Sequence, residues 1–276
     1  MKFTSIGKAK KETGLSYLGG INISSKLAKN MKVNVMTYCL YLSPSKTSGY
    51  DVCTESTTEC RLGCLATSGR AAMDIACGAN IIANARIKKT KLFFEHNEYF
   101  MAWLVAEMNA AKAKAERTGF VFSARLNGTS DIDWQKTMFN GQNIFEIFSE
   151  TPFYDYTKMA SKFDNIASNY SLTYSYTGRN WPKCLQLLAK GFNIAMIFNV
   201  KDEKYLPETF RGYKVINGDL NDYRIAEGNG IIIGLKWKRI ANKVAEANVL
   251  NSVFVMNVEG LETKFTNVPN IALINA

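Results

Sequence analysis

Three cysteines, Cys53, Cys60 and Cys64, lie within twelve residues of one another, and thiols at such short spacing serve as metal ligands or redox groups. Three thiols that leave one metal position open are the arrangement expected of an iron–sulfur cluster whose fourth iron binds a cofactor. Adding Cys39 gives four thiols, which would suit a closed structural zinc site. The Cx6CxxxC spacing matches no widespread motif, so unmetallated thiols are the third alternative.

The other cysteines, the single histidine and the absence of common motifs limit the reactions that the chain could catalyse. Cys77 and Cys184 lie among residues of helical pattern and are predicted to be small buried core residues. His96 is the single histidine of the chain, which excludes any mechanism that needs two imidazoles. No GxSxG elbow, HExxH pair or zinc-deaminase signature occurs, which argues against the common hydrolases and deaminases.

Polar side chains follow the predicted strands. Because ligands of parallel α/β folds bind at the carboxyl ends of the strands, these residues are expected to share one rim. We predict that Arg125, Asp131, Asp155, Lys158 and Asp219 orient or act on an anionic substrate, and that Asn127, Ser175 and Asn199 bind a cofactor. Such residues also cap the helices that follow strands, but capping does not explain the basic residues Arg125, Lys158 and Lys236.

Short apolar segments alternate with helical ones along the chain. Strands are predicted at 33–42, 120–126, 152–156, 170–175, 192–199, 213–217 and 230–236, and helices at 71–89, 95–117, 135–149, 157–167 and 181–190. This alternation predicts a parallel sheet, with a complete or partial β/α barrel as the favoured architecture and an open doubly wound sheet as the alternative. Residues 53–70 are predicted to form an irregular, cysteine-bearing loop after the first strand.

The length and the charge of the chain limit its domain organisation and its partners. We expect an N-terminal arm at 1–32 and a single α/β domain at 33–276. The net charge of +10 favours an anionic small molecule or a nucleic acid as partner, although solvated surface lysines would give the same composition. With no long apolar segment and no signal peptide, we expect a cytoplasmic protein without a membrane partner.

Several sequence blocks resemble one family. They are Thr37–Pro44, Cys60–Cys64 with Ser68–Arg70, Ala85–Thr90 with Leu92–Glu95, Arg125–Ile132, Phe153–Lys158, and Gly218-Asp219 with Asp222 and Arg224. In this order, over about residues 33–236, they resemble the phage gene product 88 family. The resemblance implies a bacteriophage or prophage origin, hence the host cytoplasm, and carries no established activity.

A second likeness is to radical S-adenosylmethionine enzymes, which have a three-cysteine loop after the first strand and then repeating β/α units. Here Cx6CxxxC replaces the usual CxxxCxxC spacing, and no glycine-rich cofactor motif follows. The likeness implies a 4Fe-4S cluster on Cys53, Cys60 and Cys64, with S-adenosylmethionine at the open iron. The competing expectation is a non-enzymatic factor that binds nucleic acid or a host protein and holds a structural zinc. A third is metal-free acid–base chemistry by paired carboxylates such as Asp131 and Asp155.

Overall fold

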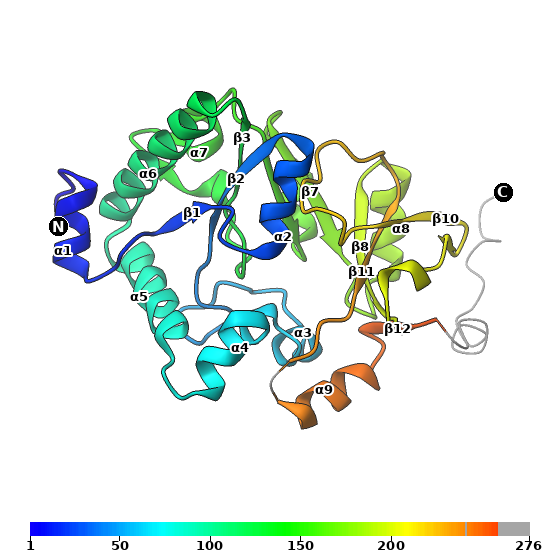
Figure 1. The fold of residues 1–276 in the computed structure, drawn as a ribbon. Helices are drawn as coiled ribbons and strands as arrows, with labels where there is room; N and C mark the ends of the chain where they lie inside the picture. Colours follow the sequence, from blue (N-terminus) through cyan, green and yellow to red (C-terminus); the bar gives the residue numbers. More distant parts are fainter. Residues whose placement is uncertain (241, 259–276) are drawn as a thin grey trace.

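The computed structural model describes residues 1–240 and 242–258, and a large sheet lies at the centre of the molecule (Figure 1). Ten strands of the described residues form it: β1 (Gly19–Ile21), β2 (Val35–Leu40), β3 (Val121–Arg125), β6 (Phe153–Thr157), β7 (Tyr170–Ser175), β8 (Asn193–Asn199), β9 (Thr209–Phe210), β10 (Tyr213–Asn217), β11 (Ile232–Lys236) and β12 (Val255–Asn257). All seven strands predicted from the sequence are present. The short strands β1, β9 and β12 were not predicted.

The strand order is β1-β2-β3-β6-β7-β8-β11-β10-β9. Neighbours from β2 to β10 are parallel, as the alternating pattern predicted, and the two end strands pair antiparallel. Within the described ranges no pairing joins β1 to β9, so the expected complete barrel is not found. The chain forms a mixed α/β fold with a large, mostly parallel sheet.

One edge of β8 is shared by two strands. β7 pairs with the first part of β8, from Asn193 to Ala195, and β12 pairs with its last part, from Ile197 to Asn199. β7 therefore leaves β8 at Ser175, and the late segment of the chain takes its place. Beyond β7, Gly178 has a φ of 92°, and a Cβ there would lie 2.7 Å from the backbone of Val253, so the loop lies directly on the segment that leads into β12.

Helices of very different length surround the sheet. They are α1 (Ile6–Thr13), α2 (Ser25–Ala28), α3 (Thr58–Leu62), α4 (Gly69–Ala76), α5 (Ile81–Glu95), α6 (Asn97–Arg117), α7 (Ile144–Ile147), α8 (Trp181–Ala189) and α9 (Lys243–Leu250), with short 3-10 turns at η1 (Lys29–Val33), η2 (Leu65–Thr67), η3 (Trp134–Lys136), η4 (Ala160–Phe163) and η5 (Glu203–Tyr205). None of the helices in the described ranges is long and apolar enough to cross a membrane.

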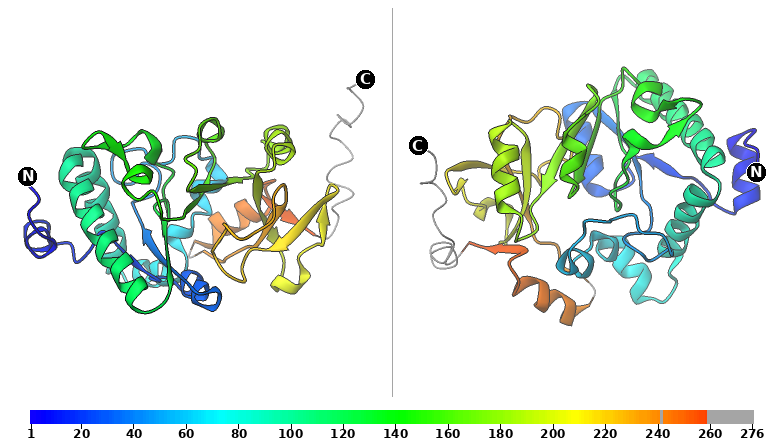
Figure 2. Two further views of the ribbon diagram at one scale, coloured as in Figure 1. Left: turned by 90° about the horizontal axis from the view of Figure 1, so that it is seen from above. Right: turned by 180° about the vertical axis from the view of Figure 1, so that it is seen from behind.

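The two faces of the sheet have different neighbours (Figure 2). On β6, the ring of Phe153 packs edge-on against Phe145 of α7, at 4.9 Å between centroids. The next residue, Tyr154, accepts a hydrogen bond from Asn30 of η1 at 3.0 Å. Because successive side chains of a strand point to opposite faces, α7 and η1 cover opposite faces. The α7 face is the main apolar core, and the η1 face is markedly polar.

The N-terminal segment is joined to this framework by one carboxylate. Glu107, buried on α6, accepts hydrogen bonds from the backbone N–H groups of Leu18 and Gly19 and from the hydroxyl of Tyr38, at 2.8–3.1 Å. Three donors on one buried carboxylate offset the loss of its hydration. Glu107 thereby fixes β1 beside β2 at the edge of the sheet.

Three predicted helices differ from the structure for local reasons. The helix expected at 71–89 is divided into α4 and α5, because Gly78 and Asn80 have positive φ. The helix expected at 135–149 holds η3, α7 and a hairpin of β4 (Met138–Phe139) and β5 (Gln142–Asn143), whose Asn140-Gly141 turn has positive φ at both residues. Only η4 remains of the helix expected at 157–167.

Candidate functional site

The cysteine loop follows β2 and lies beside α9 and β12 at the lower edge of Figure 1. Cys60 is in α3, whose first turn is capped by the hydroxyl of Thr57, and Cys64 caps η2 with its thiol, 3.5 Å from the N–H of Ala66. Cys53 accepts a contact from the N–H of Ser45 at 3.5 Å. Short helical turns therefore present Cys60 and Cys64, whereas Cys53 lies in irregular backbone before them.

A second apolar cluster supports the loop from the outside. Cys60 packs against this cluster, which includes Trp237 and residues of α9 and β12. Gly63 lies under the indole, because a Cβ at this position would be 2.9 Å from Cη2 of Trp237. Glycine at 63 is thus required by close approach of the ring.

The three thiols influence one another electrostatically. Burial, with smaller contributions from Cys64, Asp131 and Cys60, raises the pKa of Cys53 to about 12, although the N–H of Ser45 opposes the rise. Burial likewise raises the pKa of Cys64, with Cys60 adding to the rise and the cations Lys158 and Arg86 opposing it. Without a ligand the thiols of Cys53 and Cys64 are therefore neutral at pH 7, and two basic side chains stand close to them.

The described residues contain no group of three or more His, Cys, Asp or Glu side chains arranged to hold a metal ion. Cys39, the fourth ligand of the zinc alternative, is fully buried on β2. Burial raises its pKa to about 12, and the charged groups that affect it are Arg125, Asp155 and Asp222. Its surroundings are those ion-pairing residues, and this gives the four-cysteine zinc site no support.

Asp131 organises the segment next to the thiols. Its carboxylate accepts hydrogen bonds from the hydroxyl of Thr157 at 2.7 Å, from the N–H of Lys158 at 2.8 Å and from the ammonium of Lys162 at 2.5 Å. The Lys162 side chain is almost fully buried. Asp131 therefore holds the exit of β6 in place, and the Lys158 side chain is left to interact with the thiol of Cys60.

Asn127, predicted to bind a cofactor, shapes the loop after β3. Its side-chain oxygen accepts hydrogen bonds from Ser130, Ile132 and Trp134, and its amide donates to the carbonyl of Ile132, all at 2.9–3.2 Å. Its amide and its oxygen are thus already engaged within its own loop.

Asp155 and Arg125 are brought together as predicted, though not closely. Nε of Arg125 lies 3.8 Å from Oδ1 of Asp155, which also accepts the N–H of Asn127 at 2.9 Å. The hydroxyl of Tyr170 donates to the other carboxylate oxygen at 3.2 Å. Burial raises the pKa of Asp155 to about 7, and Arg125 opposes the rise only in part. Asp155 therefore titrates near neutral pH.

The closest acidic partner of Arg125 is Asp222, which is fully buried, at 2.6 Å. Although burial favours the neutral form, Arg125 and Lys26 lower the pKa of Asp222 to about 2. Lys26 lies 3.1 Å from Asp222 and 3.9 Å from Asp219. The guanidinium of Arg125 also lies over the ring of Tyr156, 4.9 Å from its centroid.

Asp219 and Lys236 meet at the carboxyl end of β11, where the N–H of Lys236 donates to Oδ2 of Asp219 at 2.8 Å. Two predicted cofactor residues lie elsewhere. Ser175 uses its carbonyl to accept the amide of Asn180, and Asn199 is exposed and bonded to Asn257 of β12. The prediction for Cys77 was wrong, because this residue is exposed at the end of α4, whereas Cys184 is buried as predicted.

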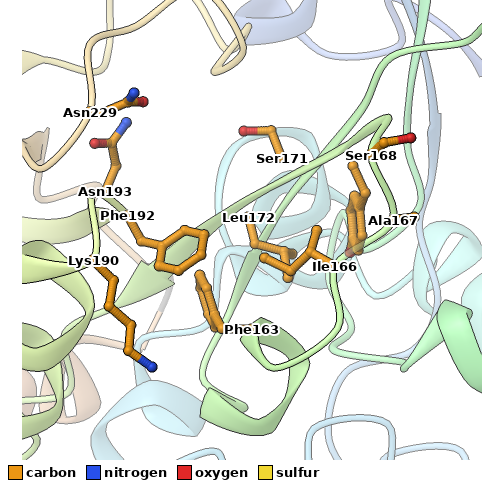
Figure 3. Close-up of a pocket in the computed structure, with 12 residues that line it drawn as sticks. Phe163, Ile166, Ala167, Ser168, Ser171, Leu172, Lys190, Phe192, Asn193 and Asn229 are labelled. Carbon is orange, nitrogen blue, oxygen red and sulfur yellow. The ribbon is translucent and has the colours of Figure 1, made fainter.

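A cavity of about 560 Å³ has no cysteine among its lining residues (Figure 3). Its lining residues precede or begin β7 and β8, so it opens at the amino ends of these strands. Phe163 and Phe192 meet edge-to-face in it, at 4.8 Å between centroids. The amide of Asn193 is already bonded to Gly228 and to the N–H of Ile231.

Several residues around the site were not predicted from the sequence. Lys26 lies in what was expected to be an arm, and no pattern there marks it. Lys238 and Trp237 follow the last predicted strand; Lys238 was counted only among the surface charges, and no role was predicted for Trp237. Asp222 and Arg224 stand within a family-like block, which was a usable signal for their position.

A family model described as Gene product 88 matches residues 6–248 of the chain. This confirms the resemblance seen in the sequence and extends it into α9. No curated protein and no solved structure matches the chain. The likeness to radical S-adenosylmethionine enzymes therefore gains no support from the comparisons.

Proposed function

The chain belongs to the Gene product 88 family of phage proteins, and from the site described above we propose that it is an iron–sulfur enzyme that acts on an anionic substrate. Cys53, Cys60 and Cys64 would hold a 4Fe-4S cluster, with S-adenosylmethionine at the remaining iron. The observation that carries the proposal is the convergence of three thiols and the Lys158 ammonium beyond the carboxyl end of β6. When bound, the cluster supplies one-electron chemistry.

The donor set suits a cluster. Sulfur ligands favour iron–sulfur clusters, and no imidazole is among the groups that shift the pKa of Cys53 or Cys64, although the carboxylate of Asp131 acts on Cys53. Each cysteine of a cluster binds a different iron, so its sulfurs lie further apart than the ligands of a single ion. Lys158 and Arg86 would offset the negative charge of the thiolates.

The other residues of the rim have separate parts in the proposal. Asp131 keeps Lys158 beside the thiols through its backbone N–H, and so acts as a positioning residue. Arg125 and its neighbours on the polar face supply the positive charge that would attract an anion, a nucleotide in our proposal. Asp155, with its pKa near neutral, is the group best suited to exchange a proton with a substrate.

The test is metal and sulfide analysis with a visible spectrum, on protein purified without oxygen. We expect brown protein with about four irons and four sulfides per chain, as a 4Fe-4S cluster requires. Cys60→Ser should lose the cluster, and Cys77→Ser, which alters an exposed cysteine outside the loop, should keep it. Folded wild-type protein that takes up no iron would overturn the proposal.

A nucleic-acid-binding factor is the second candidate, and charge favours it. Residues 1–33 hold seven lysines against a single glutamate, and Lys8, Lys10 and Lys11 are exposed on α1. Such a factor would bind single- or double-stranded nucleic acid with an affinity that falls steeply as salt rises. A filter-binding series at several salt concentrations distinguishes this candidate, which predicts colourless protein with zinc or no metal.

A further inference from the structure

A second group of charged side chains lies on the polar face of the sheet, apart from the thiols. Five basic residues from four parts of the chain meet there: Lys26 and Lys29 of the N-terminal segment, Arg125 of β3, Arg224 after β10 and Lys238 after β11. Lys26 and Arg125 both lie over the ring of Tyr156, at 5.8 and 4.9 Å from its centroid. The arrangement concentrates positive charge in one place.

The acidic residues of this group are fewer. They are Asp219, Asp222 and Glu227, and Glu227 is paired with Arg224. The fourth nearby carboxyl, Asp155, has its pKa raised to about 7 by burial and so carries only part of a charge at neutral pH. The group therefore holds an excess of positive charge, and part of it lies in a buried position where water stabilises it less.

Two ammonium groups face the same carboxylate oxygen of Asp219, and one of them, Lys26, also pairs with Asp222 at 3.1 Å. Nζ of Lys26 lies 3.9 Å from Oδ1 of Asp219, and Nζ of Lys238 lies 3.5 Å from that same atom. Both distances exceed those of a good N–H···O hydrogen bond. The other oxygen of Asp219 is bonded to the N–H of Lys236, which fixes the carboxylate between the two lysines.

The two lysines are also within reach of solvent. The Lys26 side chain is 19% exposed and that of Lys238 is 44% exposed, whereas Asp222 behind them is fully buried. Burial lowers the pKa of Lys238 and the charge of Lys26 lowers it further, whereas Asp219 and Asp222 oppose this shift. An anion entering from solvent would meet these two ammonium groups first.

We propose that Lys26 and Lys238 bind the phosphoryl group of a ligand on their solvent-facing side, away from the Asp219 carboxylate and supported by the charge of Arg125 behind them. A dianion matches the excess of positive charge better than a singly charged carboxylate does, and lysines bind phosphate as point charges. This names a phosphorylated compound as the substrate class and rests on the proposed function. The phosphoryl site is nevertheless distinct from the thiols, so iron content and phosphate binding report on the two proposals separately.

The probe is inorganic phosphate, with binding measured by calorimetry at constant ionic strength. Wild-type protein should bind phosphate, and Lys238→Gln should weaken binding at least tenfold while leaving iron content unchanged. Lys46→Ala is the matched control, because Lys46 is 78% exposed and has one long ion pair with Asp51. Equal affinity in Lys238→Gln and the wild type would overturn the site, as would a wild type that prefers phosphate no more than chloride.

If Lys238→Gln does not fold, the site can still be tested on the wild-type protein. Reductive methylation of the wild-type protein, read by mass spectrometry, should be slowed by phosphate at Lys26 and Lys238 but not at Lys46. Equal slowing at all three lysines would show ionic screening alone and would contradict the proposal. A loss of iron with intact phosphate protection would remove the iron–sulfur proposal and leave this site standing.

Discussion

Nη1 of Arg125 lies 2.6 Å from Oδ2 of Asp222, although the two residues are 97 positions apart in the sequence. This pair joins β3 to the loop after β10 across the polar face, and Lys26 joins the N-terminal segment to the same carboxylate. Arg125 thus has a structural part as well as its proposed part in anion binding.

Replacing Arg125 by alanine should lower the free energy of unfolding by about 3–5 kcal/mol, because it leaves the buried carboxylate of Asp222 without its closest partner. Urea denaturation followed by circular dichroism measures the change. Lys136→Ala is the control: it removes an ion pair with Asp133 whose lysine is 78% exposed, and should cost about 0–1 kcal/mol. Equal effects of the two substitutions would show that the Arg125 pair is worth no more than a surface pair.

Asp155 should make stability depend on pH. Burial raises its pKa from 3.8 to about 7 in the folded protein, so the folded state holds this proton more tightly than the unfolded state. The stability that protonated Asp155 gives to the folded state is fully present below pH 4 and is lost as the pH rises toward 7. In Asp155→Asn this fall should disappear, which urea denaturation between pH 4 and 8 would detect. Asp164→Asn, at an exposed carboxyl, should keep the wild-type slope.

Glu107→Gln should loosen β1. The carboxylate accepts the N–H groups of Leu18 and Gly19, and a glutamine would turn an N–H toward one of its three donors. A loss of about 1–3 kcal/mol is expected for the buried group left without a partner. Hydrogen exchange at Leu18 and Gly19 should speed up. Glu116→Gln, at an exposed position of the same helix, should leave both amides protected as in the wild type.

Gly63→Ala should disturb the cysteine loop through Trp237. The added Cβ would lie 2.9 Å from Cη2 and 3.2 Å from Cζ3 of the indole, so the ring or α3 must move. Overpacking of this kind costs about 1–3 kcal/mol, and we expect a shifted tryptophan emission and a lower iron content. Gly7→Ala has open space around it in α1 and should stabilise the protein by about 0.5–1 kcal/mol. If Gly63→Ala keeps the iron content of the wild type, the packing of Trp237 against the loop does not affect metal binding by the thiols.

Much of the sheet was predictable because buried parallel strands have a strong sequence signal. The segments predicted at 170–175 and 213–217 match β7 and β10 to the residue. The hairpin at Asn140-Gly141 was missed because an apolar helical period was given more weight than a two-residue turn signal. β12 was missed since three residues give no periodicity, and its place beside β8 depends on where β7 ends.

The candidate site was predicted in part. The thiols and Lys158 were named from the sequence, and in the structure Lys158 interacts with Cys60, which in turn influences Cys64. The partners of Arg125 were not predicted, because Asp222 and Lys26 are distant in sequence and pair only through the order of the strands. Asn127 was assigned to a cofactor from its position at a strand end, which does not reveal that its own loop already uses its amide and its oxygen.

The position of Trp237 and β12 has a consequence for the order in which the molecule is completed. Cys60 and Gly63 belong to the first third of the chain, whereas the ring and the strand that enclose them belong to its last part. On the ribosome, β2, β3, β6 and β7 can pair in the order in which they emerge, but the cysteine loop stays uncovered until the last strands follow.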